Sequence, residues 1–369
     1  MKVALLTLPL HANYGGILQC YALQAVIERM GHEVAVLNTA RGVYWTTRAG
    51  LFIKRLIKTI LRKEHRFYGC KTEPEIVLGH TRAFMQKHIH LRNVADLSLL
   101  KECDFDAIVV GSDQIWRPRY YYPIANAYLR FAKGWTSIKR VAYAASFGTD
   151  EWEYTREETE ECASLLKMFD AVSVRERSGV DLCKKHFNID AVQALDPTLL
   201  LAREDYLKLV EGTDVKRHNG GLMCYFLDET PEKTNLANQL AEKQCFELFS
   251  VNNPNADRMS LHFEKRIQEP VEQWIAGFSD ASFVVTDSFH GCVFSIIFKK
   301  PFVAIGNKSR GMSRFVSLLN LFGLSERLIF SAEEFAEKSD KLLAPIDYGR
   351  VYSEYSRLRQ QSMDFIKSI

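Results

Sequence analysis

The chain has 369 residues, of which 47% are hydrophobic and 25% charged, the composition of an ordinary globular protein with a large core. Its net charge of +3 argues against general nucleic-acid binding, which usually requires a strongly basic domain. No apolar run approaches the roughly 18 residues of a membrane span, and the eight scattered cysteines form no CxxC pair. We therefore expect a cytoplasmic protein with neither a zinc site nor a disulfide framework.

The first half of the chain alternates between strand-like and helix-like segments. Residues 2–8 form a short apolar run that leads into a turn at 11–16, so we interpret it as a first strand and not as a signal peptide. Residues 41–92 are expected to form a mostly helical insertion. The further expected strands cover 33–37, 106–110, 140–145, 171–174 and 190–193, and the expected helices cover 17–30, 155–169 and 178–187.

A polar stretch at 211–219 interrupts this alternation, which then starts again. The expected strands of the second half cover 221–227, 246–251, 283–285 and 302–305, with helices between them and an amphipathic helix at 352–369. The pattern predicts two doubly wound, Rossmann-like α/β domains that face a cleft, at 1–202 and 203–350, followed by a C-terminal helix at 351–369.

A histidine lies where the strand at 283–285 gives way to a buried helix. Ligands of open α/β sheets bind at this carboxyl edge, and helix N-termini attract anions. Histidine is the side chain whose unperturbed pKa lies nearest to physiological pH, which suits proton transfer. We therefore interpret His290 as the catalytic candidate, with Gly291 allowing a ligand to approach the backbone. The alternative is a buried histidine that is satisfied by Asp287 or a carbonyl group.

A basic cluster at 306–314 follows the next strand and opens a helix for which Ser313 is the expected N-cap. Its three cations are Lys308, Arg310 and Arg314. The cluster predicts either a cradle for a phosphate or carboxylate, or an exposed basic loop.

Arg175 also follows a strand, at the end of 171–174. It is interpreted either as a clamp for an oxyanion in the cleft or as the partner of Glu176 or of a neighbouring helix in a structural bridge.

Two polar turns with glycines follow strands of the first half, at 13–16 and 111–114. Such turns suit hydrogen bonding to a hydroxylated ligand, and neither matches a Walker loop or the GxGxxG fingerprint. Tight turns and helix caps are the alternative. Trp116 and the tyrosines at 120–122 either stack on sugars or pack within the loop. The residues predicted to bind an acceptor are Asn13, Tyr14, Gly15, Ser112, Asp113 and Gln114.

Residues 49–66 place apolar side chains on one helical face and five cations on the other. This pattern is typical of a core-facing helix with a solvated basic side, and also of a helix on an anionic membrane surface.

Taken in order along the chain, several motifs resemble the polysaccharide pyruvyl transferase family. They are Asn13-Tyr14-Gly15-Gly16 with Leu23-Gln24, the segment 105–116 with Gly111-Ser112-Asp113-Gln114, Tyr143 to Gly148, Val174-Arg175-Glu176 with Ser178, Asp196-Pro197-Thr198, and Asp287-Ser288-Phe289-His290-Gly291. The resemblance implies a fold of the glycosyltransferase-B type. It also implies transfer of a pyruvyl group from phosphoenolpyruvate to sugar hydroxyls as a ketal, with His290 as the catalytic histidine.

The chain departs from the family at one position. Relatives carry Arg-Leu before the His-Gly pair, with the arginine implicated in donor binding, whereas Ser288-Phe289 stands here. Either one of the cations Lys308, Arg310 and Arg314 substitutes for this arginine, or the donor has changed. The residues assigned to donor binding are therefore Arg175, Ser288, Gly291, Lys308, Arg310 and Arg314.

The predicted function is thus that of a pyruvyl transferase in surface-polysaccharide biosynthesis. It needs no metal or other cofactor, and it acts on a saccharide acceptor that is either free or lipid-linked at the inner face of the membrane. The alternatives are a glycosyltransferase of the same fold that uses a nucleotide sugar, and a non-catalytic sugar-binding or scaffold protein.

Overall fold

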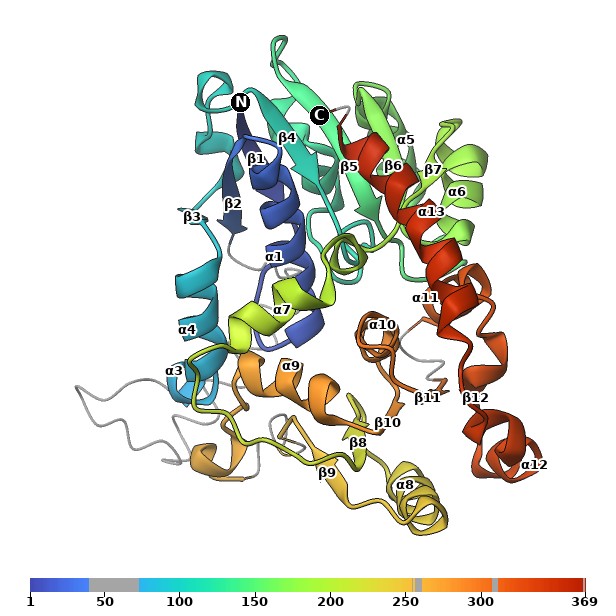
Figure 1. The fold of residues 1–369 in the computed structure, drawn as a ribbon. Coiled ribbons are helices and arrows are strands. Elements are labelled where there is room, and N and C mark those ends of the chain that lie inside the picture. The colour runs from blue at the N-terminus through green and yellow to red at the C-terminus, as the bar shows by residue number, and fades with distance from the viewer. Residues whose placement is uncertain (40–72, 254, 256–260, 307–310, 368) are drawn as a thin grey trace, which may run out of the picture.

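The computed structural model describes residues 1–39, 73–253, 255, 261–306, 311–367 and 369. Two parallel sheets form separate layers, and α7 (Arg203–Val210), α9 (Val271–Asp280) and α10 (Phe289–Ile297) lie between them (Figure 1). The helix predicted at 49–66, and the cations Lys308 and Arg310, fall outside the described residues.

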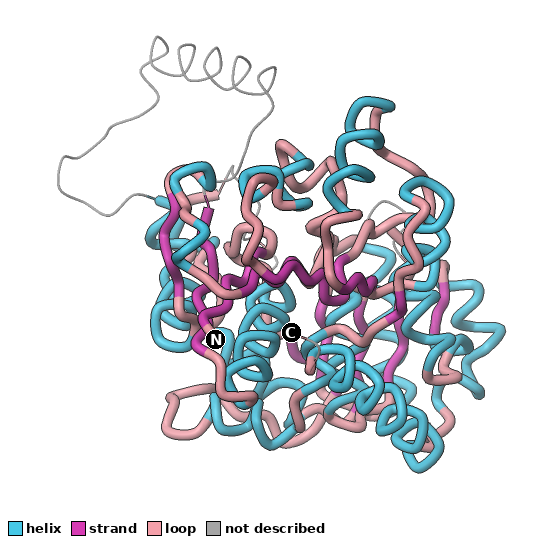
Figure 2. The backbone as a smooth tube through the Cα atoms, turned by 90° about the horizontal axis from the view of Figure 1, so that it is seen from above, coloured by secondary structure: helices cyan, strands magenta, loops and turns pink. Residues whose placement is uncertain are grey.

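The first sheet contains seven parallel strands in the order β3-β2-β1-β4-β5-β6-β7. Val3 and Leu5 of β1 face the cluster that contains α1, whereas Ala4 and Leu6 face the cluster that contains α5. Helices therefore cover both faces of the sheet (Figure 2), which explains why its strands are continuous apolar runs. The strands are β1 (Lys2–Leu6), β2 (Glu33–Thr39), β3 (Leu91–Val94), β4 (Ala107–Val110), β5 (Lys139–Ala145), β6 (Ala171–Val174) and β7 (Val192–Gln193). The α-helices are α1 (Tyr14–Arg29), α3 (Glu73–Val77), α4 (Gly79–His88), α5 (Arg156–Leu166) and α6 (Arg177–Leu182).

The second sheet contains five parallel strands in the order β12-β11-β10-β8-β9. Its inner face packs against α9 and α10 within the same hydrophobic cluster that contains α1, so one core joins the two halves. The strands are β8 (Leu222–Tyr225), β9 (Leu248–Ser250), β10 (Phe283–Thr286), β11 (Phe302–Ile305) and β12 (Leu328–Ile329). The remaining helices are α8 (Pro231–Gln244) and α12 (Ala332–Leu343) on the outer face, α11 (Ser313–Leu321), and α13 (Tyr348–Ile366).

The last helix, α13, runs alongside both halves (Figure 1). Near its start, the Tyr348 hydroxyl donates to the carbonyl of Lys300 in the second half at 2.6 Å. Further along, the Tyr355 hydroxyl donates to the carbonyl of Leu199 in the first half at 2.7 Å. The helix therefore ties the two halves together. None of the helices in the described ranges is long and apolar enough to cross a membrane.

Two local expectations were wrong, and one strand was not expected. The pattern did not predict strand β3, because it is a short edge strand with one buried residue and no apolar run. Helix α1 begins at Tyr14 and not at 17, since Asn13 accepts from the Gly16 amide as its N-cap and the glycines concealed this start. Ser313 is the first residue of α11, and Met312 is the N-cap.

Candidate active site

Ser288 and Gly291 build the turn that carries His290. The Ser288 hydroxyl accepts from the Gly291 amide at 3.4 Å and so caps α10. A Cβ atom at Gly291 would lie 2.2 Å from the Thr286 hydroxyl, so glycine lets the helix lie directly on the end of β10. These contacts give both residues a structural role in the turn, which differs from the donor contacts predicted for them.

Asp287 is turned away from His290. Its carboxylate accepts from the amides of Leu227 and Asp228, at 2.6 and 3.1 Å, and from the Lys233 ammonium at 2.6 Å. It therefore fixes the loop after β8 to the turn after β10. The alternative in which Asp287 satisfies the histidine is wrong.

His290 instead faces the first half. Its Nε2 lies 3.6 Å from Oδ2 of Asp196, and no described residue lies within hydrogen-bonding distance of that nitrogen. On another side, a Cβ atom at Gly15 would lie 2.1 Å from Nδ1 of His290, so the first turn of α1 packs directly on the imidazole. His290 is 4% exposed. The histidine of one half is therefore held by the other half.

Asp196 belongs to a buried chain of charges. Arg175 donates to Asp196 at 2.7 Å and to Asp113 at 3.2 Å, while Thr198 donates to the second oxygen of Asp196 at 2.7 Å. Burial opposes ionisation of Asp196, but His290, Arg175 and Thr198 outweigh it and hold its pKa below the usual range. The pKa of Asp113 is lowered in the same way, against burial, by Arg175, His290 and Arg314.

A second arginine reaches this cluster from the other half. The guanidinium carbons of Arg175 and Arg314 lie 4.6 and 5.7 Å from the ring centre of Phe289, the residue next to His290. Burial and the charge of Arg175 lower the pKa of Arg314 to about 10, so it stays cationic at neutral pH. Two cations from different halves thus converge beside the histidine.

Glu176 is not the partner of Arg175, contrary to the structural alternative. It accepts from the Ser146 hydroxyl at 2.9 Å and from the amides of Phe147 and Gly148 at 2.8 and 3.0 Å. It therefore shapes the loop after β5, which packs against the second half: a Cβ atom at Gly311 would lie 1.9 Å from the carbonyl of Gly148.

A cavity of about 410 Å³ opens between the two halves next to this cluster, and we call it the interdomain cavity. Asn13, Asp113 and Gln114, three of the predicted acceptor residues, line it. They lie at the carboxyl ends of β1 and β4, the neighbouring strands between which the chain order of the sheet reverses. Ligands of doubly wound sheets bind at such switch points.

The other three predicted acceptor residues are used differently. Tyr14 lines the interdomain cavity, but its hydroxyl donates to the carbonyl of Glu269 and to Gln268, at 2.8 and 3.0 Å, so it joins the two halves. Ser112 is fully buried and donates to the carbonyl of Ala144 at 2.8 Å. Gly15 lies beneath His290.

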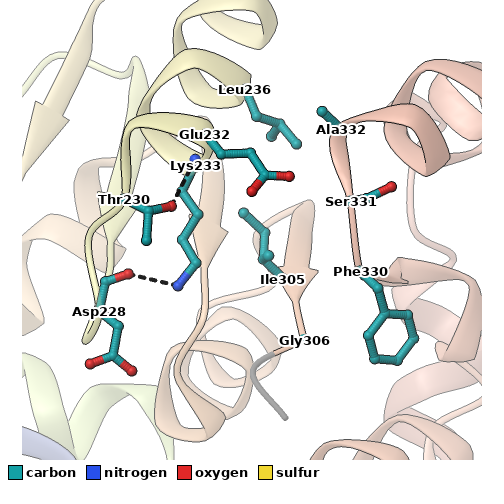
Figure 3. Close-up of a pocket in the computed structure, with 10 residues that line it drawn as sticks. All are labelled: Asp228, Thr230, Glu232, Lys233, Leu236, Ile305, Gly306, Phe330, Ser331 and Ala332. Atoms are coloured by element: carbon teal, nitrogen blue, oxygen red, sulfur yellow. Dashed lines mark hydrogen bonds between the residues drawn. The ribbon is translucent and has the colours of Figure 1, made fainter. Parts of the chain in front are cut away.

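A second large cavity, of about 490 Å³, lies wholly in the second half (Figure 3). Thr230 and Ser331, the N-caps of α8 and α12, line it, together with the carboxylate of Glu232 and the ring of Phe330. Its one described cation, Lys233, is already paired with Asp287. The N-termini of α8 and α12 attract anions whereas the carboxylate of Glu232 repels them, so the described charges of this cavity are mixed.

Sequence reasoning assigned no role to Asp196 or Phe289. The signal for Asp196 was present, since Asp-Pro-Thr after a short strand is typical of a side chain that caps the following turn, and Asp196 does accept from the Thr198 amide. Nothing in the local sequence indicates that its other oxygen, Oδ2, lies next to His290. Among the described residues, no group of three His, Cys, Asp or Glu side chains could hold a metal ion.

Comparison with known proteins bears on the fold and the family of the chain. Among curated proteins, none matches the sequence. The fold is similar to that of UDP-GlcNAc 2-epimerase from Neisseria meningitidis, with a TM-score of 0.53 and 10% identity over 100% of both chains. It is also similar to the Methanocaldococcus jannaschii epimerase, with a TM-score of 0.50 and 12% identity over 93% of each chain.

Arabidopsis thaliana UGT89C1, complexed with UDP-L-rhamnose, gives a TM-score of 0.50 and 13% identity over 98% of this chain and 94% of that one. At such identities the likeness shows the fold alone, which is of the glycosyltransferase-B type. The sequence profile named polysaccharide pyruvyl transferase matches residues 13–309, well over half of the chain. The chain therefore belongs to the polysaccharide pyruvyl transferase family.

Proposed function

We propose that the protein transfers a pyruvyl group from phosphoenolpyruvate to two hydroxyls of a saccharide, forming a cyclic ketal in surface-polysaccharide biosynthesis. The observation that carries the proposal is the buried cluster at the interdomain cavity. It combines a group that can move a proton, His290, with two arginines that can meet an anionic donor. The neighbouring cavity offers the amide and carboxylate groups that hydroxyls require.

The chemistry divides between these groups. A proton is added to the methylene carbon of phosphoenolpyruvate, and one sugar hydroxyl attacks the adjacent carbon and loses its own proton. The bond from that carbon to the phosphate oxygen then breaks, and a second hydroxyl attacks to close the ketal. One hydroxyl proton balances the proton taken up by carbon, and the other leaves with inorganic phosphate. His290 is the residue proposed to move these protons.

The arginines have the complementary task of stabilising negative charge on the donor. Arg175 pairs with Asp113 and Asp196, and Arg314 is the second buried cation that we propose to meet the donor. Lys308 and Arg310 follow β11 in the sequence and stay proposed donor contacts. In this proposal, cations from outside the turn take the place of the arginine that relatives carry at the position of Ser288.

The alternative is a glycosyltransferase that uses a nucleotide sugar. The Neisseria epimerase was solved with UDP-GlcNAc and the Arabidopsis protein with UDP-L-rhamnose. The cavity of Figure 3 is large enough to raise this alternative, and two helix N-termini line it, but the carboxylate of Glu232 and the pairing of Lys233 with Asp287 weigh against a diphosphate. The buried histidine and arginines beside the interdomain cavity are the observation that favours the pyruvyl donor.

Phosphate release from phosphoenolpyruvate tests the proposal. The purified protein is incubated with phosphoenolpyruvate and a panel of saccharides, including saccharides linked to polyprenyl diphosphate, and the product is examined for a ketal by mass spectrometry. Acceptor-dependent phosphate release with a matching mass gain is expected. A thermal shift with UDP or GDP, together with no phosphate release for any acceptor, would favour the nucleotide-sugar alternative instead.

A further inference from the structure

A smaller cavity lies beside the interdomain cavity at the same sheet edge. It has a volume of about 190 Å³ and is lined by residues at or after the ends of β1, β2, β3 and β4, such as Thr39 and Asp96. Pro9 and Tyr120 line both cavities. Because the carboxyl ends of parallel strands share one edge, the two cavities are neighbours at that edge. We call the smaller one the distal cavity.

The lining of the distal cavity has the chemistry of a neutral sugar site. Three consecutive tyrosines contribute to it, and Asp96 and Asn126 add a carboxylate and an amide. None of the ten described residues that line it is a lysine or arginine. Aromatic faces suit the apolar face of a pyranose, while carboxylates and amides suit its hydroxyls. Among the described lining residues, a phosphate or diphosphate would meet a carboxylate and no cation.

Tyr120 is held in place at the junction of the two cavities. The guanidinium of Arg117 lies 5.1 Å from the ring centre of Tyr120. Glu153 fixes Arg117 in turn, accepting from its Nε at 2.9 Å and from its Nη2 at 2.7 Å. A ring that is already positioned loses little freedom when a ligand stacks on it, which favours binding.

We propose that the distal cavity binds the sugar next to the one that is pyruvylated, so that the acceptor is at least a disaccharide. The inference rests on the proposed function, which places the pyruvylated sugar in the interdomain cavity. The distal cavity itself is a saccharide site whose occupation requires no donor.

Binding without donor tests this site. Calorimetry compares methyl glycosides of glucose, galactose, mannose and N-acetylglucosamine with cellobiose, lactose, mannobiose and chitobiose. At least one disaccharide is expected to bind about fivefold or more tightly than its monosaccharide, the gain that one aromatic contact brings. Equal binding of every pair, including no binding by either member, would overturn the proposal.

Variants of the lining residues test whether the distal cavity causes the tighter binding of the disaccharide. Ala95 is exposed and lines the distal cavity, so Ala95→Trp should fill it and remove the disaccharide gain while monosaccharide binding stays unchanged. Tyr120→Ala should remove the same gain. Leu99→Trp is the matched control, because Leu99 is 70% exposed nearby and lines neither cavity. A gain that survives in Ala95→Trp would place the second sugar elsewhere.

The assay also separates the two proposals. If phosphoenolpyruvate is not the donor, phosphate release fails while the disaccharide gain and its loss in Ala95→Trp remain. If the distal cavity is not a sugar site, phosphate release can still occur, with equal efficiency for monosaccharides and disaccharides.

Discussion

His290 and Asp196 meet across the boundary between the two halves, with Nε2 of the imidazole 3.6 Å from Oδ2 of the carboxylate. Asp196 is held by Arg175 and Thr198 of its own half, so its position does not depend on the histidine. A buried carboxylate beside an imidazole orients the ring and stabilises its charged form. The site is therefore complete only where the two halves meet.

The first prediction concerns His290 itself. His290→Gln keeps a polar side chain of similar size but cannot move a proton, so pyruvyl transfer should fall by about 100-fold or more. The thermal unfolding temperature should change little by comparison. His262→Gln is the control, since His262 is exposed, with 61% of its side-chain surface accessible. Equal activity of wild type and His290→Gln would remove the histidine from the mechanism.

The second prediction separates the two carboxylates that pair with Arg175. Asp196→Asn and Asp113→Asn each remove one partner of the arginine, but only Asp196 contacts His290. Loss of the charge at 196 removes the group that orients the imidazole and stabilises its charged form, so kcat should fall by about tenfold or more. The loss should be larger for Asp196→Asn than for Asp113→Asn, and Asp196→Glu should restore part of the activity. Equal kcat values for Asp196→Asn and Asp113→Asn would mean that the contact with His290 contributes nothing to the reaction.

The third prediction uses a glycine pair at the start of α1. A methyl group at Gly15 would lie 2.1 Å from the imidazole, whereas at Gly16 the nearest side-chain atom is 3.7 Å away. Gly15→Ala should therefore displace His290 and lower kcat by about tenfold or more, as small misplacements of catalytic groups do. Gly16→Ala adds the same group one residue further along and should have a much smaller effect. The ratio of the two kcat values measures the displacement, and a ratio near one would contradict the close packing.

The sequence predicted most of the fold because buried parallel strands leave continuous apolar runs. Strand β6 and strand β11 were located to the residue. Two of the four edge strands escaped prediction, since β3 has one buried residue and β12 has only two residues. The start of α1 also escaped, because Tyr14-Gly15-Gly16 has the composition of a turn and only the cap by Asn13 makes it helical.

The candidate site was predicted less completely, since it is assembled from distant segments. Local pattern located His290, Arg175 and Arg314 individually at the ends of strands. The pairing of Arg175 with Asp113 and Asp196 depends on how β4, β6 and β7 are arranged, which sequence spacing does not contain. The same limit applies to Tyr14, whose bond to Glu269 joins residues 255 positions apart.

The fourth prediction concerns the donor. Arg314→Gln should raise the KM for phosphoenolpyruvate by about tenfold or more, because a hydrogen bond to a charged group contributes about 1.5–3 kcal/mol. The KM for the saccharide should change little. Arg357→Gln, on the exposed side of α13, is the control. An unchanged KM for phosphoenolpyruvate in Arg314→Gln would assign the donor charge to other cations.

The fifth prediction follows from the lowered pKa of Asp196. A carboxyl whose pKa is lower in the folded state takes up protons first in the unfolded chain, so acid favours unfolding. Its stabilising effect is complete above the unfolded pKa, near 4, and is lost as the pH falls toward the folded value. Asp196→Asn should lower the free energy of unfolding by about 3 kcal/mol at neutral pH, since a buried ion pair loses one partner.

The difference in the free energy of unfolding between wild type and Asp196→Asn should therefore be constant above about pH 5 and shrink toward about pH 3. Urea denaturation at fixed pH values measures it. Asp190→Asn is the control, because that carboxylate is exposed and its replacement should give a small difference throughout the range. The free-energy difference between wild type and Asp196→Asn could instead stay constant down to pH 3, about one unit below the unfolded pKa. That result would mean that Arg175 and His290 do not stabilise the ionised carboxylate in the folded protein. The charge chain that links the two halves would then not stabilise the closed arrangement.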